Sequence, residues 1–113
     1  MENEENVVIF ITTSMDEEAK KIANMLLEQR KAACVNILPK ISSHFWWQGR
    51  LDSAQEHLLI VKTKASLLKE VVRLVRENHS YEVPEIIAVP IIGGNPDYLE
   101  WIGKEVRQMR KTG

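Results

Sequence analysis

The strongest constraint in this sequence is that its apolar segments carry hydrophobic side chains at both odd and even positions. The clearest cases are VVIFITT at residues 7–13, LLIV at 58–61 and IIAVPII at 86–92. Short runs rich in β-branched residues predict strands, and a strand that is apolar at both parities is covered on both faces. A sheet built from these strands therefore needs protein on each side.

Helical spacing of apolar side chains predicts three helices between and after the strands. We expect Ser14, at capping-box spacing from Glu17, to begin the first helix, and Ser66 to begin the second. Asn95 and Pro96 are typical of the cap and the first position of a third helix. The apolar side of that third helix consists of Leu99, Ile102, Val106 and Met109.

Residues 33–64 predict a long β-hairpin. We expect a two-residue turn at Gly49-Arg50, which would pair Trp47 with Asp52, and a bulge at Pro39. Both strands are longer than the usual ~5–6 residues. The free end of the hairpin, with its three consecutive aromatic residues, would project beyond the other strands and need a partner to cover it.

The element order is β-α-β-β-α-β followed by a C-terminal helix. It predicts an α+β, ferredoxin-like fold in which residues 7–113 form a single domain and residues 1–6 a flexible end. Helices on one face of the antiparallel sheet would leave the other apolar face bare in a lone chain. A second copy of the chain is the most economical cover, so we expect a homo-oligomer.

Composition narrows the location and the partners. The acidic start, MENEEN, lacks the basic and apolar parts of a secretory signal, and no apolar run is long enough for a bilayer. Cys34 is the only cysteine, so no internal disulfide can form. The formal net charge is -1 and no basic block stands out. We expect a cytoplasmic protein without nucleic-acid or membrane partners.

Several motifs, in this order, resemble the CutA divalent-cation-tolerance family. They are ACVNILP at 33–39, the S-x-F-x-W-x-G spacing at 43–49, KT at 62–63 and HSYEVPEIIAVPI at 79–91. Phe45 stands where the family usually has Tyr. Ser80 replaces a Pro, which loosens the backbone of its loop.

The resemblance covers about residues 7–102 and implies a homotrimer whose sheets pack around a threefold axis, as in the PII signalling proteins. It also implies a link to tolerance of copper and other divalent metals. It does not imply a catalysed reaction, and no nucleophile–base constellation or cofactor fingerprint is recognisable, so we expect no enzyme. We also expect no cofactor to be required for folding.

The resemblance further implies a ligand cleft between subunits. Its candidate residues are Trp47, Glu56, Lys62, Tyr81, Glu82 and Glu85, together with Cys34. Carboxylates and a phenol beside a lysine and a tryptophan would form a small polar pocket. The alternative is that Tyr81 and Glu82 lock the subunit interface through hydrogen bonds, with Lys62 paired to a carboxylate.

The candidate metal ligands are Cys34, His44, His57 and His79. A thiolate suits copper(I) or zinc, and three copies would supply three thiols, although a strand cysteine also packs as a small hydrophobe. The expected hairpin register makes His44 and His57 diagonal neighbours on one face, where two solvated side chains are the alternative. His79 follows the second helix, where interaction with the helix dipole explains it equally well.

Three function classes follow, ranked in order, and the last is an enzyme that uses Tyr81, Glu82 and Lys62 as acid–base groups, against which no nucleophile–base constellation is recognisable. The first is a homotrimer that binds copper or another divalent metal ion and responds to such ions. The second is a PII-like sensor that binds a small ligand in the cleft between subunits. Neither the metal nor a downstream protein partner follows from the sequence.

Overall fold

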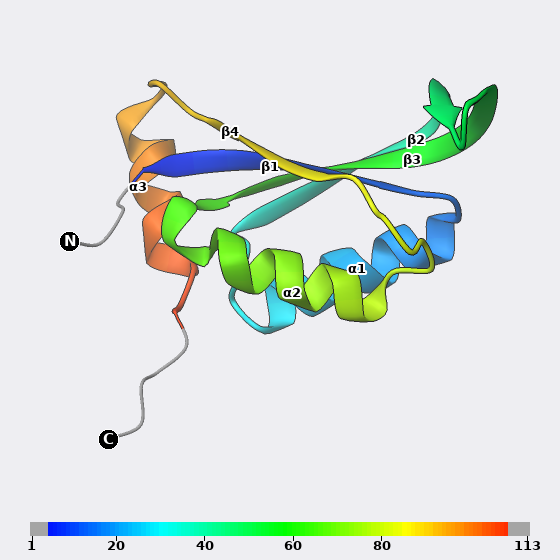
Figure 1. Cartoon of the computed structure of the whole chain (residues 1–113). Coiled ribbons are helices and arrows are strands. Elements are labelled where there is room, and N and C mark those ends of the chain that lie inside the picture. Colours follow the sequence, from blue (N-terminus) through cyan, green and yellow to red (C-terminus); the bar gives the residue numbers. More distant parts are fainter. Residues whose placement is uncertain (1–4, 109–113) are drawn as a thin grey trace.

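The computed structural model describes residues 5–108 and has one antiparallel sheet with two long helices along one face (Figure 1). Its strands and α-helices are β1 (Asn6–Thr13), α1 (Asp16–Glu28), β2 (Cys34–Trp47), β3 (Arg50–Lys64), α2 (Leu68–Asn78), β4 (Ile86–Pro90) and α3 (Pro96–Glu105). The strand order is β2-β3-β1-β4. This arrangement confirms the predicted ferredoxin-like α+β fold.

The ordered part of the chain begins earlier than expected. Asn6 is the first residue of β1, and the Glu5 carbonyl accepts a hydrogen bond of 2.7 Å from the backbone N–H of Ala65. The expected flexible end at residues 1–6 therefore does not include Glu5 and Asn6. Residues 1–4 lie outside the described part of the chain.

The first two helices begin differently from the prediction. The N-cap of α1 is Met15, and it makes no side-chain capping hydrogen bond, so the capping box of Ser14 and Glu17 is wrong. A 3-10 turn, Ala65–Leu67, leads into α2 in place of a helix capped by Ser66. Only two or three residues separate each of these two helices from the strand before it.

The third helix begins as predicted. The Asn95 side chain accepts a hydrogen bond of 3.1 Å from the Asp97 backbone N–H, and Pro96 is the first helical residue. The helix ends at its C-cap Val106. Met109, expected on its apolar side, lies outside the described residues. Across residues 5–108 no helix has the length and apolar character needed to cross a membrane.

The turn of the long hairpin lies one residue earlier than predicted. Trp47 pairs with Arg50, so the turn residues are Gln48 and Gly49, with φ angles of 50° and 77°. Two positive φ angles are what a type I′ turn requires, and its twist matches that of the strands. The predicted pairing of Trp47 with Asp52 is wrong by two residues. Because this shift is even, the side chains keep their predicted faces.

The bulge expected near Pro39 is present. The pairing register shifts between Leu38 and Ile41, and Lys40 has a φ of 58°. A bulge of this kind bends its strand and increases the local twist. The free end of the hairpin extends beyond the shorter strands and curls away from the helices (Figure 1).

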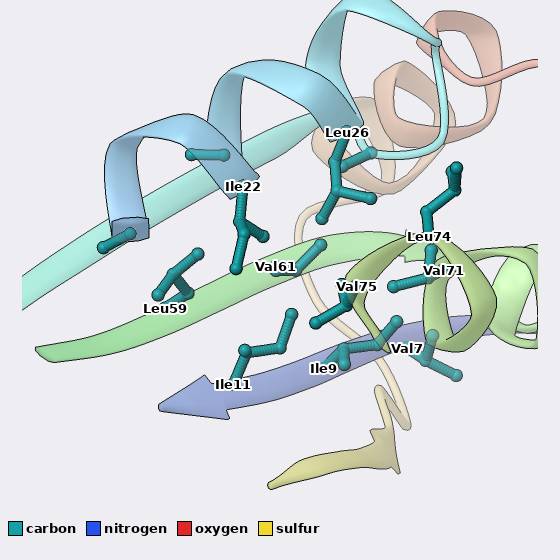
Figure 2. Close-up of a cluster of buried hydrophobic side chains, with 13 residues drawn as sticks. Val7, Ile9, Ile11, Ile22, Leu26, Leu59, Val61, Val71, Leu74 and Val75 are labelled. Atoms are coloured by element: carbon teal, nitrogen blue, oxygen red, sulfur yellow. The ribbon is translucent and has the colours of Figure 1, made fainter. Parts of the chain in front are cut away.

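The hydrophobic core lies between the sheet and the helices α1 and α2 (Figure 2). Its sheet side consists of Val7, Ile9, Ile11, Leu59 and Val61. Its helix side includes Ile22, Leu26, Val71, Leu74 and Val75. The strand residues all have odd numbers, and the helix residues recur three or four positions apart. Each strand and each helix therefore turns one face to the core.

The opposite face of the sheet, called the open face below, is also apolar. Phe10 pairs with both Ile60 and Ile87, which places the three side chains in one row. The apolar members of this face are Leu38, Val8, Phe10, Leu58, Ile60, Ile87 and Val89. Neither α1 nor α2 covers them (Figure 1), and Ile87 is 53% exposed. The prediction that the strands are apolar on both sides is confirmed.

Two neighbouring leucines in α1 test this assignment of the core. Leu26 is fully buried, whereas Leu27 is 36% exposed. We expect Leu26→Ala to lower the free energy of unfolding by about 2–5 kcal/mol, because it leaves a cavity in a close-packed core. The matched change Leu27→Ala should cost well under half as much. Urea denaturation of both variants measures the difference, and equal losses would contradict the core described here.

Candidate functional site

A groove lies where the free end of the hairpin meets the loop between α2 and β4. Its volume is about 780 Å³. From the hairpin it is lined by Ser43, His44, Phe45, Trp46, Trp47, Asp52 and Glu56, and from β1 and the loop by Thr12, Tyr81, Glu82, Val83, Pro84 and Glu85. Aromatic rings and carboxylates therefore share the same walls, as in a site for a small molecule.

The loop is tied to β1 and α1 by side chains that reach far along the sequence. The fully buried imidazole of His79 lies with Nε2 2.7 Å from the Thr12 carbonyl, while its Nδ1 accepts a 3.0 Å hydrogen bond from the Tyr81 N–H. These bonds fit the neutral tautomer with the proton on Nε2. The Glu18 carboxylate accepts hydrogen bonds from the Ser80 N–H and hydroxyl, at 2.7 and 3.0 Å. These contacts hold the loop although position 80 is a serine and not the proline expected from the resemblance.

A buried carboxylate and a phenol lie at the base of the groove. Glu56 is 7% exposed, and its Oε2 accepts a 2.8 Å hydrogen bond from the Tyr81 hydroxyl. Burial and this carboxylate raise the pKa of Tyr81 to about 12, against a smaller lowering by the Ser14 side chain. Partial burial and the charge of Glu56 also raise the pKa of Glu85. The groove therefore holds more negative charge than its own groups compensate.

The structure brings most of the predicted cleft residues together. Trp47, Glu56, Tyr81, Glu82 and Glu85 all line the groove. Lys62 does not, because it lies six residues further along β3, roughly 20 Å from Glu56 at the rise of a strand. The expected proximity of Lys62 to these carboxylates is therefore wrong within one chain.

Lys62 belongs to a second cluster, at the other end of the open face, together with Cys34. Cys34 pairs with Lys62 across the strands, and the ammonium of Lys62 contacts the Asn36 side-chain oxygen and lies 4.0 Å from the Cys34 sulfur. The Cys34 Sγ is also 3.8 Å from the Asn36 Oδ1. Burial and the neighbouring Cys34 raise the pKa of Tyr98, which approaches from α3. The ammonium next to the thiol opposes the approach of a metal cation.

The candidate metal ligands are not gathered in one place. His44 pairs with Ser53, so His57 lies four residues away along β3, roughly 13 Å, and the expected diagonal contact is wrong. The His57 Nδ1 is buried without a hydrogen-bond partner, and His79 anchors the loop. In the described part of the chain, no three side chains of His, Cys, Asp or Glu are grouped so that they could hold a metal ion. A metal site within one chain does not fit these residues.

Some residues of the groove and its supports were missed by sequence reasoning. Asp52 becomes a neighbour of Phe45 only with the observed turn. The signal for that turn was available, because glycine favours the second central position of a type I′ turn, here Gly49. The anchoring role of Glu18 had no local signal, since its partner Ser80 is 62 residues away.

Tyrosinate titration tests the buried phenol. The folded-state pKa of Tyr81, about 12, lies above the ordinary value of 10.0. The folded state therefore binds more protons across this interval, and stability from the protonated phenol is lost as pH rises through about 12. We expect the ultraviolet absorbance titration to show a component near this pH that disappears in Tyr81→Phe. A wild-type titration with both tyrosines near their ordinary pKa would contradict the contact with Glu56.

Comparison with known proteins agrees with this architecture. Residues 7–105 match the family described as CutA1 divalent ion tolerance protein. The chloroplastic protein CutA 1 of Oryza sativa subsp. japonica is 44% identical over 103 residues, which cover 91% of this chain. The chain spans 58% of the length of that relative.

Solved structures extend the likeness to three dimensions. The crystal structure of CutA1 from Oryza sativa has a TM-score of 0.90 and 43% identity, covering 93% of this chain and 96% of the other. The periplasmic divalent cation tolerance protein CutA from Archaeoglobus fulgidus has a TM-score of 0.87 and 45% identity, covering 90% and 99%. Chloroplastic and periplasmic relatives leave the cytoplasmic location of this chain a prediction. The chain belongs to the CutA1 divalent ion tolerance protein family.

Proposed function

We propose that this chain acts as a homotrimeric divalent-cation tolerance protein that binds copper or another divalent metal ion and takes part in the response to such ions. The observation that carries the proposal is the family match, which spans the sheet and all three α-helices of the described chain. Relatives carry the name divalent-cation tolerance protein CutA. The family description names ion tolerance and no catalysed reaction, so the proposed role is non-enzymatic.

The open face supports assembly. Leu38, Ile87 and Val89 are 51%, 53% and 42% exposed in the lone chain, and they continue into the half-buried Phe10 and Ile60. Soluble monomers rarely expose a contiguous apolar patch of this kind. The sheet of another copy offers a surface of matching chemistry, and closed symmetry lets every copy cover its face in the same way. The number three comes from the resemblance to the family.

A charge placed on the open face tests the assembly. We expect the wild-type chain to sediment at three times the mass of one chain at micromolar concentration. Ile87→Lys should dissociate it, because the assembly would bury an unpaired ammonium. The matched change Met15→Lys adds the same charge at a residue that is 58% exposed on the helix side, and it should leave the trimer intact. A monomeric wild type, or equal dissociation by both variants, would contradict the proposed interface.

Metal binding, in this proposal, depends on more than one copy. The described part of a single chain groups no three metal-binding side chains, and its cysteine lies beside an ammonium. Cys34 is half-buried on the sheet face that the trimer is proposed to cover. Neighbouring copies would add the further ligands that a soft metal ion requires around a thiolate.

Calorimetric titration with copper(I), copper(II) and zinc tests the metal role on the purified assembly. We expect binding at micromolar concentration or tighter, lost in Cys34→Ala and kept in Glu82→Gln, because a thiolate is the soft ligand. The opposite pattern would move the metal to the carboxylates of the groove. If no metal ion produced heat with the wild-type protein, the metal-binding part of the proposal would be wrong.

The groove favours a second candidate function, a PII-like sensor of a small ligand. Its volume of about 780 Å³ falls within the ~300–1,000 Å³ usual for small-molecule sites. Ligands that bind only the folded state raise the melting temperature, so a thermal-shift screen with and without metals separates the two functions. If an organic ligand raised the melting temperature and no metal ion produced heat in the calorimeter, small-ligand sensing would replace metal binding as the leading function.

A further inference from the structure

We propose that the groove between the free end of the hairpin and residues 81–85 binds a small organic ammonium ion. This inference rests on the second candidate function, the groove as a small-ligand site, and is independent of metal binding at Cys34. It follows from the charge of the groove, from its aromatic walls and from the way its carboxylates are spread.

The charged groups of the groove select a cation. Among the described residues, its lining includes four acidic side chains, Asp52, Glu56, Glu82 and Glu85, and one basic residue, His44. Glu56 is nearly buried, and hydrogen bonding to Tyr81 fixes one of its oxygens. A fixed negative charge in a partly desolvated wall attracts cations more strongly than an exposed carboxylate does. An anionic ligand would meet the same charges as repulsion.

The aromatic walls select an organic cation. Phe45, Trp46 and Trp47 line the groove from the hairpin, and Tyr81 lines it from the loop. Trp46 and Trp47 are 70% and 49% exposed in the lone chain, so its own core does not occupy their rings. Ammonium groups are attracted to aromatic faces by the ring quadrupole, and tryptophan attracts them most strongly. Phe45 lies directly opposite Asp52 on the hairpin, so ring and carboxylate are adjacent.

The spread of the carboxylates argues against a bare divalent ion at this place. Calcium and magnesium require several oxygens to converge within about 2.0–2.6 Å of one point. In residues 5–108 no group of three acidic, histidine or cysteine side chains meets that need. An organic ammonium ion is larger than a calcium or magnesium ion, and its charge can lie near several carboxylates of the groove at the same time. The raised pKa of Glu85, caused by partial burial and by Glu56, indicates negative charge that such a ligand would compensate.

Fluorescence titration with tetramethylammonium tests the proposal on the assembled protein, at constant ionic strength. Trp101→Phe serves as the background, so that the signal comes from Trp46 and Trp47. We expect a saturable change with tetramethylammonium and binding at least about tenfold weaker with tert-butanol, a neutral molecule of similar size.

Charge variants locate the site. We expect Glu56→Gln and Glu85→Gln each to weaken binding by about fivefold or more, because each removes one negative charge from the groove. The matched control is Glu28→Gln, which removes an exposed carboxylate at the end of α1 and should change affinity by less than about twofold. Glu85 is solvent-accessible, so its variant keeps the test valid if the buried Glu56→Gln fails to fold.

The outcomes separate this inference from the function on which it rests. Equal binding of tert-butanol would show an apolar ligand site, so sensing would stand and the ammonium ligand would be overturned. Displacement of tetramethylammonium by lower concentrations of magnesium would make the groove a site for inorganic cations and would also overturn it. If tetramethylammonium, tert-butanol and the thermal-shift ligands all failed to bind, both the inference and the sensor function would be wrong.

Discussion

The structure depends on a sheet that is apolar on both faces and covered by its own helices on only one. On the helix side, Ile9 and Val61 face α1 and α2 and close a continuous core. On the other side, Phe10 lies in a row with Ile60 and Ile87, which neither α1 nor α2 covers. Hydrophobic burial is the largest favourable term in folding and association. The same force that packs the helices therefore also favours assembly.

The candidate groove is a consequence of unequal strand lengths. β2 and β3 continue past the ends of β1 and β4, and their free end meets the loop that follows α2 (Figure 1). The loop is placed by contacts between distant parts of the chain, His79 with Thr12 and Tyr81 with Glu56. His79, which the sequence presented as a metal ligand or a helix-end residue, instead fixes backbone on which the groove depends.

The chemistry of the chain divides between two ends of the open face. At one end are aromatic rings and the carboxylate of Glu56, and at the other the thiol of Cys34 beside the ammonium of Lys62. The resemblance to the family named Glu56, Cys34 and Lys62 as candidates, but it placed all three in one cleft. Side chains alternate along β3, so Glu56 and Lys62 share a face, but their separation along the strand keeps them apart within one chain. Any contact between the two ends requires a second copy.

The sequence by itself determined the ferredoxin-like element order, the two-sided apolar strands, the bulge near Pro39 and the start of α3 at Asn95. These features follow from periodicity, proline and capping, which act over a few residues. Only the tertiary structure decided the use of His79 as an anchor, the pairing register of the hairpin and the scattering of the candidate metal ligands. Register and long-range hydrogen bonds depend on how whole strands meet, and a one- or two-residue change in a turn moves every pairing beyond it.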